Sequence, residues 1–240
     1  MAKNLKNRCL PLCGFGISTP HIKILARRNY TLFGFAMMIG HESGKGEDNE
    51  EDASMNQGSL RDITGVILVG GKSRRMGRDK AFLQIAGKTF FERVLAVFRG
   101  SFDRFVLVGD RAERFTDYGL PVLSDIYPGS ALGGLYTALY HAETEYIFVS
   151  SCDLPFPNRE ILLYLCSLRD GFDAVVPNTA HGLEPLFALY AKSCLAPMRA
   201  LLESGNFCAY AYYPQIRVRY VQDEEIAHFN RDGRSFVNVN

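Results

Sequence analysis

Apolar runs alternate with amphipathic segments along the chain from residue 63 onward. The run ITGVILVG at 63–70 is rich in β-branched residues and ends in glycine, which is typical of a parallel strand buried on both faces. The segment 89–98 has its apolar residues at helical spacing instead. Further strands are predicted at 104–109, 120–125, 145–153, 172–178, 184–190 and 216–221, and further helices at 111–117, 131–142, 158–168 and 193–204. Ser193 is the expected N-cap of the last helix.

This alternation of strands and helices predicts the fold class. It indicates an α/β fold with one domain, built on a mostly parallel, Rossmann-like twisted sheet with helices on both faces. Sheets of this kind bind ligands beyond the C-terminal ends of their strands. We therefore expect the chemistry of the protein in the loops that follow residues 69, 108, 125 and 153.

The first 62 residues follow a different pattern. The stretch HESGKGEDNEED at 41–52 is polar and acidic, without an apolar period, which is typical of a solvated linker. The apolar run at 31–40 follows two arginines and faintly resembles an export signal, but it lies deep in the chain and lacks a cleavage site. We expect residues 1–62 to be a poorly ordered extension or the product of a start site assigned too early, with Met55 as an alternative start. The functional domain is predicted at 63–240.

Composition narrows the classes of function. The 240 residues carry 27 Lys+Arg and 26 Asp+Glu, a net charge of +1, which argues against a nucleic-acid backbone as the main partner. No apolar run reaches 18 residues, so no membrane-spanning helix is expected. Six scattered cysteines do not make a disulfide scaffold in a chain of this length, which favours a reducing, cytoplasmic location.

The loop after the first predicted strand carries the most informative chemistry. Residues 70–80, GGKSRRMGRDK, combine three glycines with five cationic side chains. Glycines let backbone N–H groups approach an anion closely, and the cations neutralise it, so the loop suits a polyphosphate. It is not a P-loop, because the first glycine of that motif would fall at Val66, and Lys72 breaks the dinucleotide fingerprint. The alternative is a flexible basic surface loop.

The segment 68–80 matches the pattern L-x-G-G-x-S-x-R-M-G-x-D-K. It resembles the signature of nucleotidyltransferases that activate small molecules with a nucleoside triphosphate, and in particular the molybdenum cofactor guanylyltransferase (MobA) family. On this resemblance the nucleotide-binding residues of the segment are Leu68, Gly70, Gly71 and Lys80, and the catalytic ones are Arg75 and Lys80.

Two later segments extend the resemblance on the nucleotide side. The segment 128–134, PGSALGG, is similar to the family's glycine-rich segment, and Asp125 just before it implies a contact with guanosine. Gly133 is then nucleotide-binding, with close helix packing as the alternative. Asp153, in CDLP after the fourth strand, matches the family's aspartate that binds Mg²⁺, an ion that prefers carboxylate, water and phosphate oxygens. Where the family often has an asparagine, this chain has Gly109 followed by Asp110, so Asp110 is the candidate contact there.

The acceptor side is indicated by two other matches. The segment 184–190, EPLFALY, resembles the family's strand beside the acceptor, so Glu184 lines the acceptor pocket or is a surface residue. The terminal FVNVN matches the start of the F-x-N-x-N-T-P motif, which implies acceptor contacts by Asn238 and Asn240. The sequence stops there, where family members continue into a short helix, and this leaves the roles of both asparagines open.

The resemblance implies a reaction. The terminal phosphate of molybdopterin attacks the α-phosphate of GTP, so that pyrophosphate leaves and molybdopterin guanine dinucleotide forms. The implied partners are GTP, molybdopterin, other proteins of cofactor biosynthesis and acceptor molybdoenzymes, with a monomer favoured, and Mg²⁺ bound at Asp153. Two alternatives stay open, namely a CTP-dependent cytidylyltransferase acting on molybdopterin or a sugar-alcohol phosphate, and a non-catalytic nucleotide-binding regulator.

Overall fold

The structure is a computed structural model, and it describes residues 60–70, 80–109 and 112–237. The chain divides into two units, Met1–Asn56 and Gln57–Asn240. The predicted N-terminal extension, residues 1–62, lies outside the described residues apart from its last three. Of these, Leu60 donates its backbone N–H to the carbonyl oxygen of Ser101 at 2.8 Å, and Asp62 forms an ion pair with Arg169.

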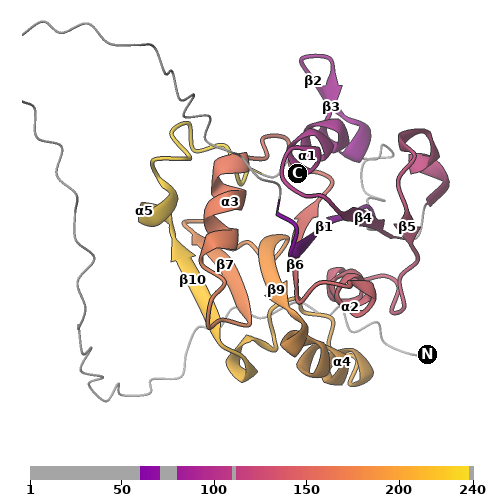
Figure 1. The fold of residues 1–240 in the computed structure, drawn as a ribbon, viewed down its shortest axis with the longest axis vertical. Helices are drawn as coiled ribbons and strands as arrows, with labels where there is room; N and C mark the ends of the chain where they lie inside the picture. The colour runs from indigo at the N-terminus through magenta and orange to yellow at the C-terminus, as the bar shows by residue number, and fades with distance from the viewer. Residues whose placement is uncertain (1–59, 71–79, 110–111, 238–240) are drawn as a thin grey trace, which may run out of the picture. The chain divides into compact units, whose positions relative to one another are not determined.

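A mixed sheet of eight strands forms the centre of the described unit (Figure 1). Its path runs β10, β7, β9, β6, β1, β4, β5, and β8 pairs with β7 off this path. The strands are β1 (Ile63–Leu68), β4 (Phe105–Val108), β5 (Val122–Leu123), β6 (Tyr146–Ser151), β7 (Ala174–Thr179), β8 (Gly182–Leu183), β9 (Phe187–Ala191) and β10 (Val218–Gln222). All of them run in one direction except β8 and β9, which are antiparallel to their neighbours. The predicted mostly parallel α/β sheet is confirmed, and most strands end at the same edge.

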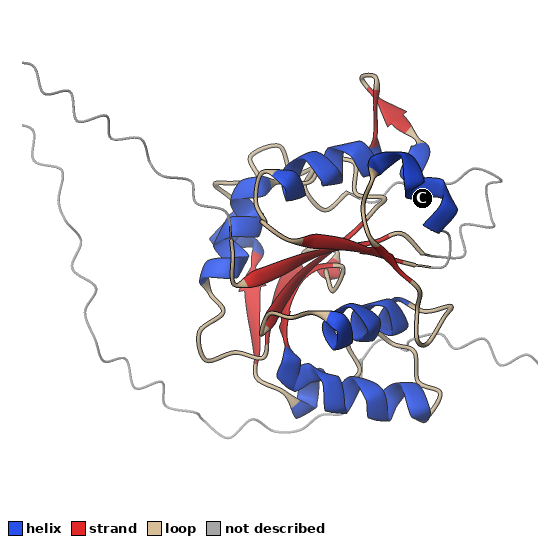
Figure 2. Cartoon of the chain, turned by 45° about the vertical axis from the view of Figure 1, so that its right-hand side comes forward, coloured by secondary structure: helices blue, strands red, loops and turns tan. Residues whose placement is uncertain are grey.

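Helices cover both faces of this sheet (Figure 2). On one face lie α1 (Phe90–Arg99), α3 (Arg159–Ser167) and α5 (Asp223–Ile226), and on the other lie α2 (Ala131–His141) and α4 (Leu195–Glu203). Alternate residues of β1 divide between the two layers, because Ile63 and Ile67 join the first core cluster whereas Val66 and Leu68 join the second. In the ranges that the structure describes, every helix is too short or too polar to span a bilayer.

Local chemistry explains where the elements begin. Thr89 caps α1 with a reciprocal capping box, in which its hydroxyl accepts from the Glu92 N–H at 3.1 Å and the Glu92 carboxylate accepts from the Thr89 N–H at 2.7 Å. The prediction that Ser193 caps the helix expected at 193–204 is wrong. Its hydroxyl donates to Asp173 at 2.8 Å, and α4 begins two residues later without a side-chain cap.

Several predicted elements differ in extent. The helix expected at 111–117 is a 3₁₀ helix at Ala112–Tyr118, and the strand expected at 120–125 shortens to two residues. The strand expected at 184–190 starts only at Phe187. Three short features were not predicted from the pattern, since none of their strands or helices exceeds four residues: the hairpin of β2 (Gln84–Ile85) and β3 (Lys88–Thr89), the strand β8, and the helix α5.

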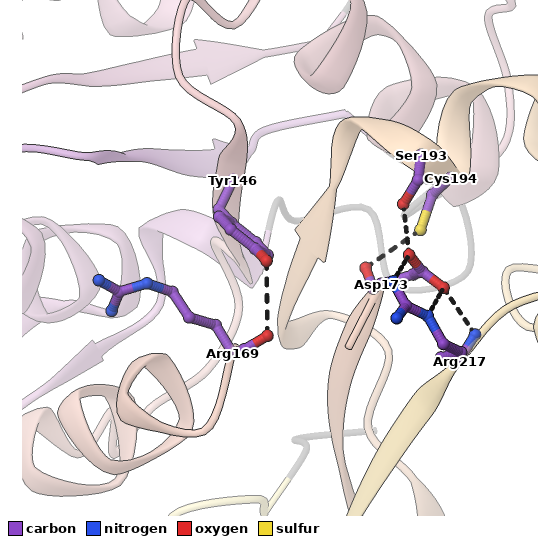
Figure 3. Close-up of polar contacts among 6 residues, drawn as sticks. All are labelled: Tyr146, Arg169, Asp173, Ser193, Cys194 and Arg217. Carbon is purple, nitrogen blue, oxygen red and sulfur yellow. Dashed lines mark hydrogen bonds and ion pairs between the residues drawn. The ribbon is translucent and has the colours of Figure 1, made fainter. Parts of the chain in front are cut away.

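Asp173 ties three segments together at the edge of the sheet opposite the strand ends (Figure 3). Its carboxylate accepts hydrogen bonds from the Ser193 hydroxyl and from the backbone and guanidinium of Arg217, at 2.8 to 3.2 Å. Its backbone oxygen also accepts from the Cys194 thiol. The hydrogen bond from the Arg217 side chain, followed by the other hydrogen bonds, lowers the pKa of Asp173 to about 2 despite its burial. Beside this carboxylate lies an open hollow of about 400 Å³, which Pro197 and Gln215 also line.

We predict that Asp173→Asn destabilises the protein at neutral pH by about 1–2 kcal/mol, a value reduced for the exposure of Arg217. The folded pKa is depressed, so the ionised carboxylate stabilises the fold above the unfolded pKa near 4, and this contribution is lost as the pH falls towards 2. Urea unfolding at pH 7 and pH 3 measures the difference. The exposed Asp170→Asn is the matched control. An equal loss of unfolding free energy at both pH values would contradict the lowered pKa of Asp173.

Candidate active site at the carboxyl edge of the sheet

Backbone hydrogen bonds hold the ends of the central strands side by side. The N–H of Val69 donates to the carbonyl oxygen of Val108 at 2.8 Å, which extends the pairing of β1 and β4 by one residue. On the other side, the N–H of Cys152 donates to the Leu68 oxygen at 3.1 Å. The loops after β1, β4 and β6 therefore leave the sheet from adjacent points, and they are three of the loops in which we expect the chemistry.

Gly109 is required by this close approach. A Cβ built at position 109 would lie 2.5 Å from the Gly70 nitrogen and 2.9 Å from the Val69 carbonyl carbon, distances that real side chains do not adopt. In this backbone the end of β1 fills the space that a side chain at position 109 would need. The neighbouring candidate, Asp110, lies outside the described residues.

The first turn of α2 lies against the end of β1 and against Asp125, two residues after β5. A Cβ at Gly134 would lie 3.2 Å from Leu68 Cδ2 and 3.6 Å from Asp125 Oδ1. The missing side chain at 134 therefore lets Leu68 and Asp125 lie close to one helix turn. Two residues predicted to contact the nucleotide, from segments far apart in the sequence, are brought together here.

Gly133 has a close structural neighbour of its own. Its N–H donates to the hydroxyl of the N-cap Ser130 at 3.0 Å, and a Cβ would lie 1.9 Å from the Tyr127 carbonyl oxygen. The glycine is thus explained by the approach of the preceding loop to α2. Its contact with a nucleotide stays a prediction.

Lys80 is the first described residue after the glycine-rich loop. It opens the 3₁₀ helix Lys80–Phe82, where it is half-buried. The end of this helix is fixed by Phe82, whose ring stacks on Phe115 with centroids 5.5 Å apart. At the other end of the loop, Gly70 is exposed. Gly71 and Arg75 lie outside the described residues.

Asp153 lies two residues after the end of β6 and is half-buried. The neighbouring Leu154 is buried, and the Phe156 ring contacts the guanidinium of Arg234 at 5.1 Å and that of Arg93 at 6.0 Å. In the described ranges no group of three His, Cys, Asp or Glu residues could hold a metal by itself. A single strand-end carboxylate fits Mg²⁺ well, because this ion keeps several waters and takes its other ligands from substrate phosphates.

Glu184 directly follows β8 and lies at the same edge, beside the last residues of β7. Its N–H donates to the Pro177 oxygen at 3.0 Å, and Asp223, the residue after β10, accepts from the Ala180 N–H at 2.6 Å. Burial, and then the nearby Asp223 carboxylate, raise the pKa of Glu184 to about 7, although a hydrogen bond with Thr179 opposes the shift. Glu184 is half-buried. Its neighbours Asp223 and Thr179 were not predicted from the sequence, although Thr179 ends β7 and Asp223 directly follows β10.

The C-terminal segment also reaches this edge. Phe236 is buried, and its ring meets Phe187 with centroids 5.8 Å apart. Phe187 starts β9 and lies opposite Ser150, three residues before Asp153. The contact between Phe236 and Phe187 holds the chain at the strand ends two residues before position 238. Asn238 and Asn240 themselves lie outside the described residues.

The loops after β1, β4 and β6 gather at the carboxyl edge of a mostly parallel sheet, where α/β proteins bind their ligands. The protein is a nucleotidyltransferase. Residues 65–221 match the model of the MobA-like NTP transferase domain, and the chain belongs to this family.

Individual relatives agree with this assignment. The chain is 35% identical over 178 residues to a probable molybdenum cofactor guanylyltransferase of Pelotomaculum thermopropionicum, a match that covers 74% of this chain and 87% of the relative. It is 32% identical over 181 residues to the molybdenum cofactor guanylyltransferase of Desulfosudis oleivorans, covering 74% and 90%. The crystal structure of molybdopterin-guanine dinucleotide biosynthesis protein A from Archaeoglobus fulgidus aligns with a TM-score of 0.66 and 28% identity, over 74% of this chain and 92% of that one.

We predict that Glu184→Gln stabilises the protein at pH 8 by about 2 kcal/mol. The raised pKa means that the folded state holds the Glu184 proton more tightly than the unfolded chain does. Stability from this group is therefore present below pH 4.5 and is lost as the pH rises through about 7. Urea unfolding at pH 5 and pH 8 tests this, with the exposed Glu113→Gln as the control. A gain of the same size at both pH values would refute the shifted pKa.

Proposed function

We propose that the protein transfers GMP from GTP to molybdopterin, forming molybdopterin guanine dinucleotide and releasing pyrophosphate. The observation that carries the proposal is the meeting of Leu68, Asp125 and the Asp153 loop at the strand ends from which the glycine- and cation-rich loop departs. The names of the relatives supply the substrates. We assign this activity to residues 63–240, with residues 1–62 as an extension.

The attacking group is a phosphate that is already an anion, so no protein nucleophile or strong base is needed. Catalysis then consists of holding two anions in line and offsetting their charge. Lys80 holds the triphosphate, and Arg75 stabilises the charge that develops during transfer. Gly70 and Gly71 let the phosphates approach the backbone.

Enzymes of this family use a divalent cation. We propose Mg²⁺ at Asp153, where the bound ion would act as a template and a Lewis acid. On the nucleoside side, Leu68 packs near the base, and the Asp125 carboxylate accepts hydrogen bonds from donors of the guanosine. Asp110 and Gly133 complete the proposed nucleotide contacts.

Glu184, Asn238 and Asn240 form the proposed acceptor side. A carboxyl whose pKa is about 7 can accept or donate a hydrogen bond near neutral pH, which suits a heterocycle with both kinds of group. Phe236, two residues before Asn238 in the sequence, packs against Phe187 at the same edge. We place the reaction in the cytoplasm, and the free thiols of Cys152, Cys166, Cys194 and Cys208 are compatible with a reducing compartment.

A panel of the four nucleoside triphosphates with molybdopterin and Mg²⁺, scored for pyrophosphate release, tests the proposal. We expect release with GTP and only in the presence of molybdopterin.

Asp153→Asn should remain folded, as judged by its unfolding temperature, and should lose about 10²–10³-fold in kcat, in line with the loss of one transition-state contact. The control is the exposed Asp170→Asn, which should react like the unmodified protein.

Each alternative has its own outcome in this panel. Preference for CTP would replace the proposal with the cytidylyltransferase, and binding of GTP without pyrophosphate release would replace it with the regulatory protein. Unimpaired turnover by Asp153→Asn would remove this residue from the mechanism.

A further inference from the structure

Thr137 is a fully buried threonine in the middle of α2. Its hydroxyl accepts a hydrogen bond from the Ile126 backbone N–H at 2.9 Å and donates one to the Gly133 carbonyl oxygen at 2.8 Å. Ile126 is the residue directly after Asp125. One hydroxyl group therefore joins the segment that carries Asp125 to the first turn of the helix.

The other contacts of this segment bring the same two parts together. The Tyr127 carbonyl lies in the space left by the missing side chain of Gly133, and Asp125 lies in the space beside Gly134. These two approaches at Gly133 and Gly134 are van der Waals contacts, which limit how close the groups come but do not fix their orientation. The two hydrogen bonds of Thr137 are directional, and they fix the backbone one residue from the carboxylate.

We infer that Thr137 is a positioning residue for the nucleoside part of the bound triphosphate, acting through Asp125. The inference rests on the proposed function, in which Asp125 contacts the nucleoside. A carboxylate binds well only when it is held within a fraction of an ångström of its productive position, and its support must come from packed, hydrogen-bonded neighbours. Thr137 supplies that support from inside the core, without touching the ligand.

Thr137→Val tests this inference, because it keeps the shape of the side chain but removes both hydrogen bonds. Thr137→Ser restores the hydroxyl and should rescue the variant. The matched control is Thr64→Val, since Thr64 is also buried and its hydroxyl is 2.7 Å from that of Thr144, but it lies at the opposite end of β1. Thr137→Ala is the second variant, in case valine prevents folding.

We expect Thr137→Val to raise the Kd for GTP by calorimetry, and the KM for GTP, by about 10-fold, with kcat changed less than about twofold, as for a loss of uniform binding. Thr137→Ser should stay within about twofold of the unmodified protein, and so should Thr64→Val, even though the latter lowers the unfolding temperature. In an Asp125→Ala background, adding Thr137→Val should have little further effect on the Kd, because both changes remove the same contact.

Normal GTP affinity in a folded Thr137→Val or Thr137→Ala protein would overturn the inference. It would also be overturned by an equal rise of the Kd in Thr64→Val, which would indicate general destabilisation, or by fully additive effects with Asp125→Ala. An unmodified protein that binds no GTP is a separate result. It would refute the proposed function first, and the inference with it.

Discussion

The close backbone contact between the ends of β1 and its two neighbours is the constraint on which the rest of the site depends. The Val69 N–H bonds to β4, and the Leu68 oxygen accepts from Cys152 after β6. Position 109 requires a glycine because the Gly70 backbone occupies the space that a side chain would need. When strands end this closely, their loops begin within reach of one ligand, and an α/β sheet places its binding site there for that reason.

The two edges of the sheet carry different kinds of polar chemistry. At the far edge, the Asp173 carboxylate accepts hydrogen bonds from Ser193 and Arg217, and its lowered pKa reflects a carboxylate that stabilises the fold. At the carboxyl edge, Glu184 is partly buried beside Asp223, and its pKa is raised. The ionised form of the Glu184 carboxyl is destabilised at the end of a strand. This fits a binding role, because shifted pKa values concentrate at active sites. The contrast supports the division of the sheet into a structural edge and a functional one.

The sequence alone predicted the order of the long elements, because β1 and β6 are apolar runs of strand length and α1 has its apolar residues at helical spacing. Motifs pointed to Leu68, Asp125 and Asp153, which the structure places at the carboxyl edge of the sheet, and their contacts with a nucleotide or a metal stay predictions. It could not predict the hairpin β2–β3 or the strand β8, since two-residue strands leave no period to detect. Ser193 was misassigned as a cap because its partner, Asp173, is 20 residues away in the sequence.

A crystal structure of the protein with GTP and Mg²⁺ would show whether one nucleotide binds at the ends of β1 and β6. We predict phosphates beside Gly70 and Lys80, a metal at Asp153 and the nucleoside against Asp125. A nucleotide bound elsewhere, for example in the hollow beside Asp173 at the opposite edge, would contradict this prediction.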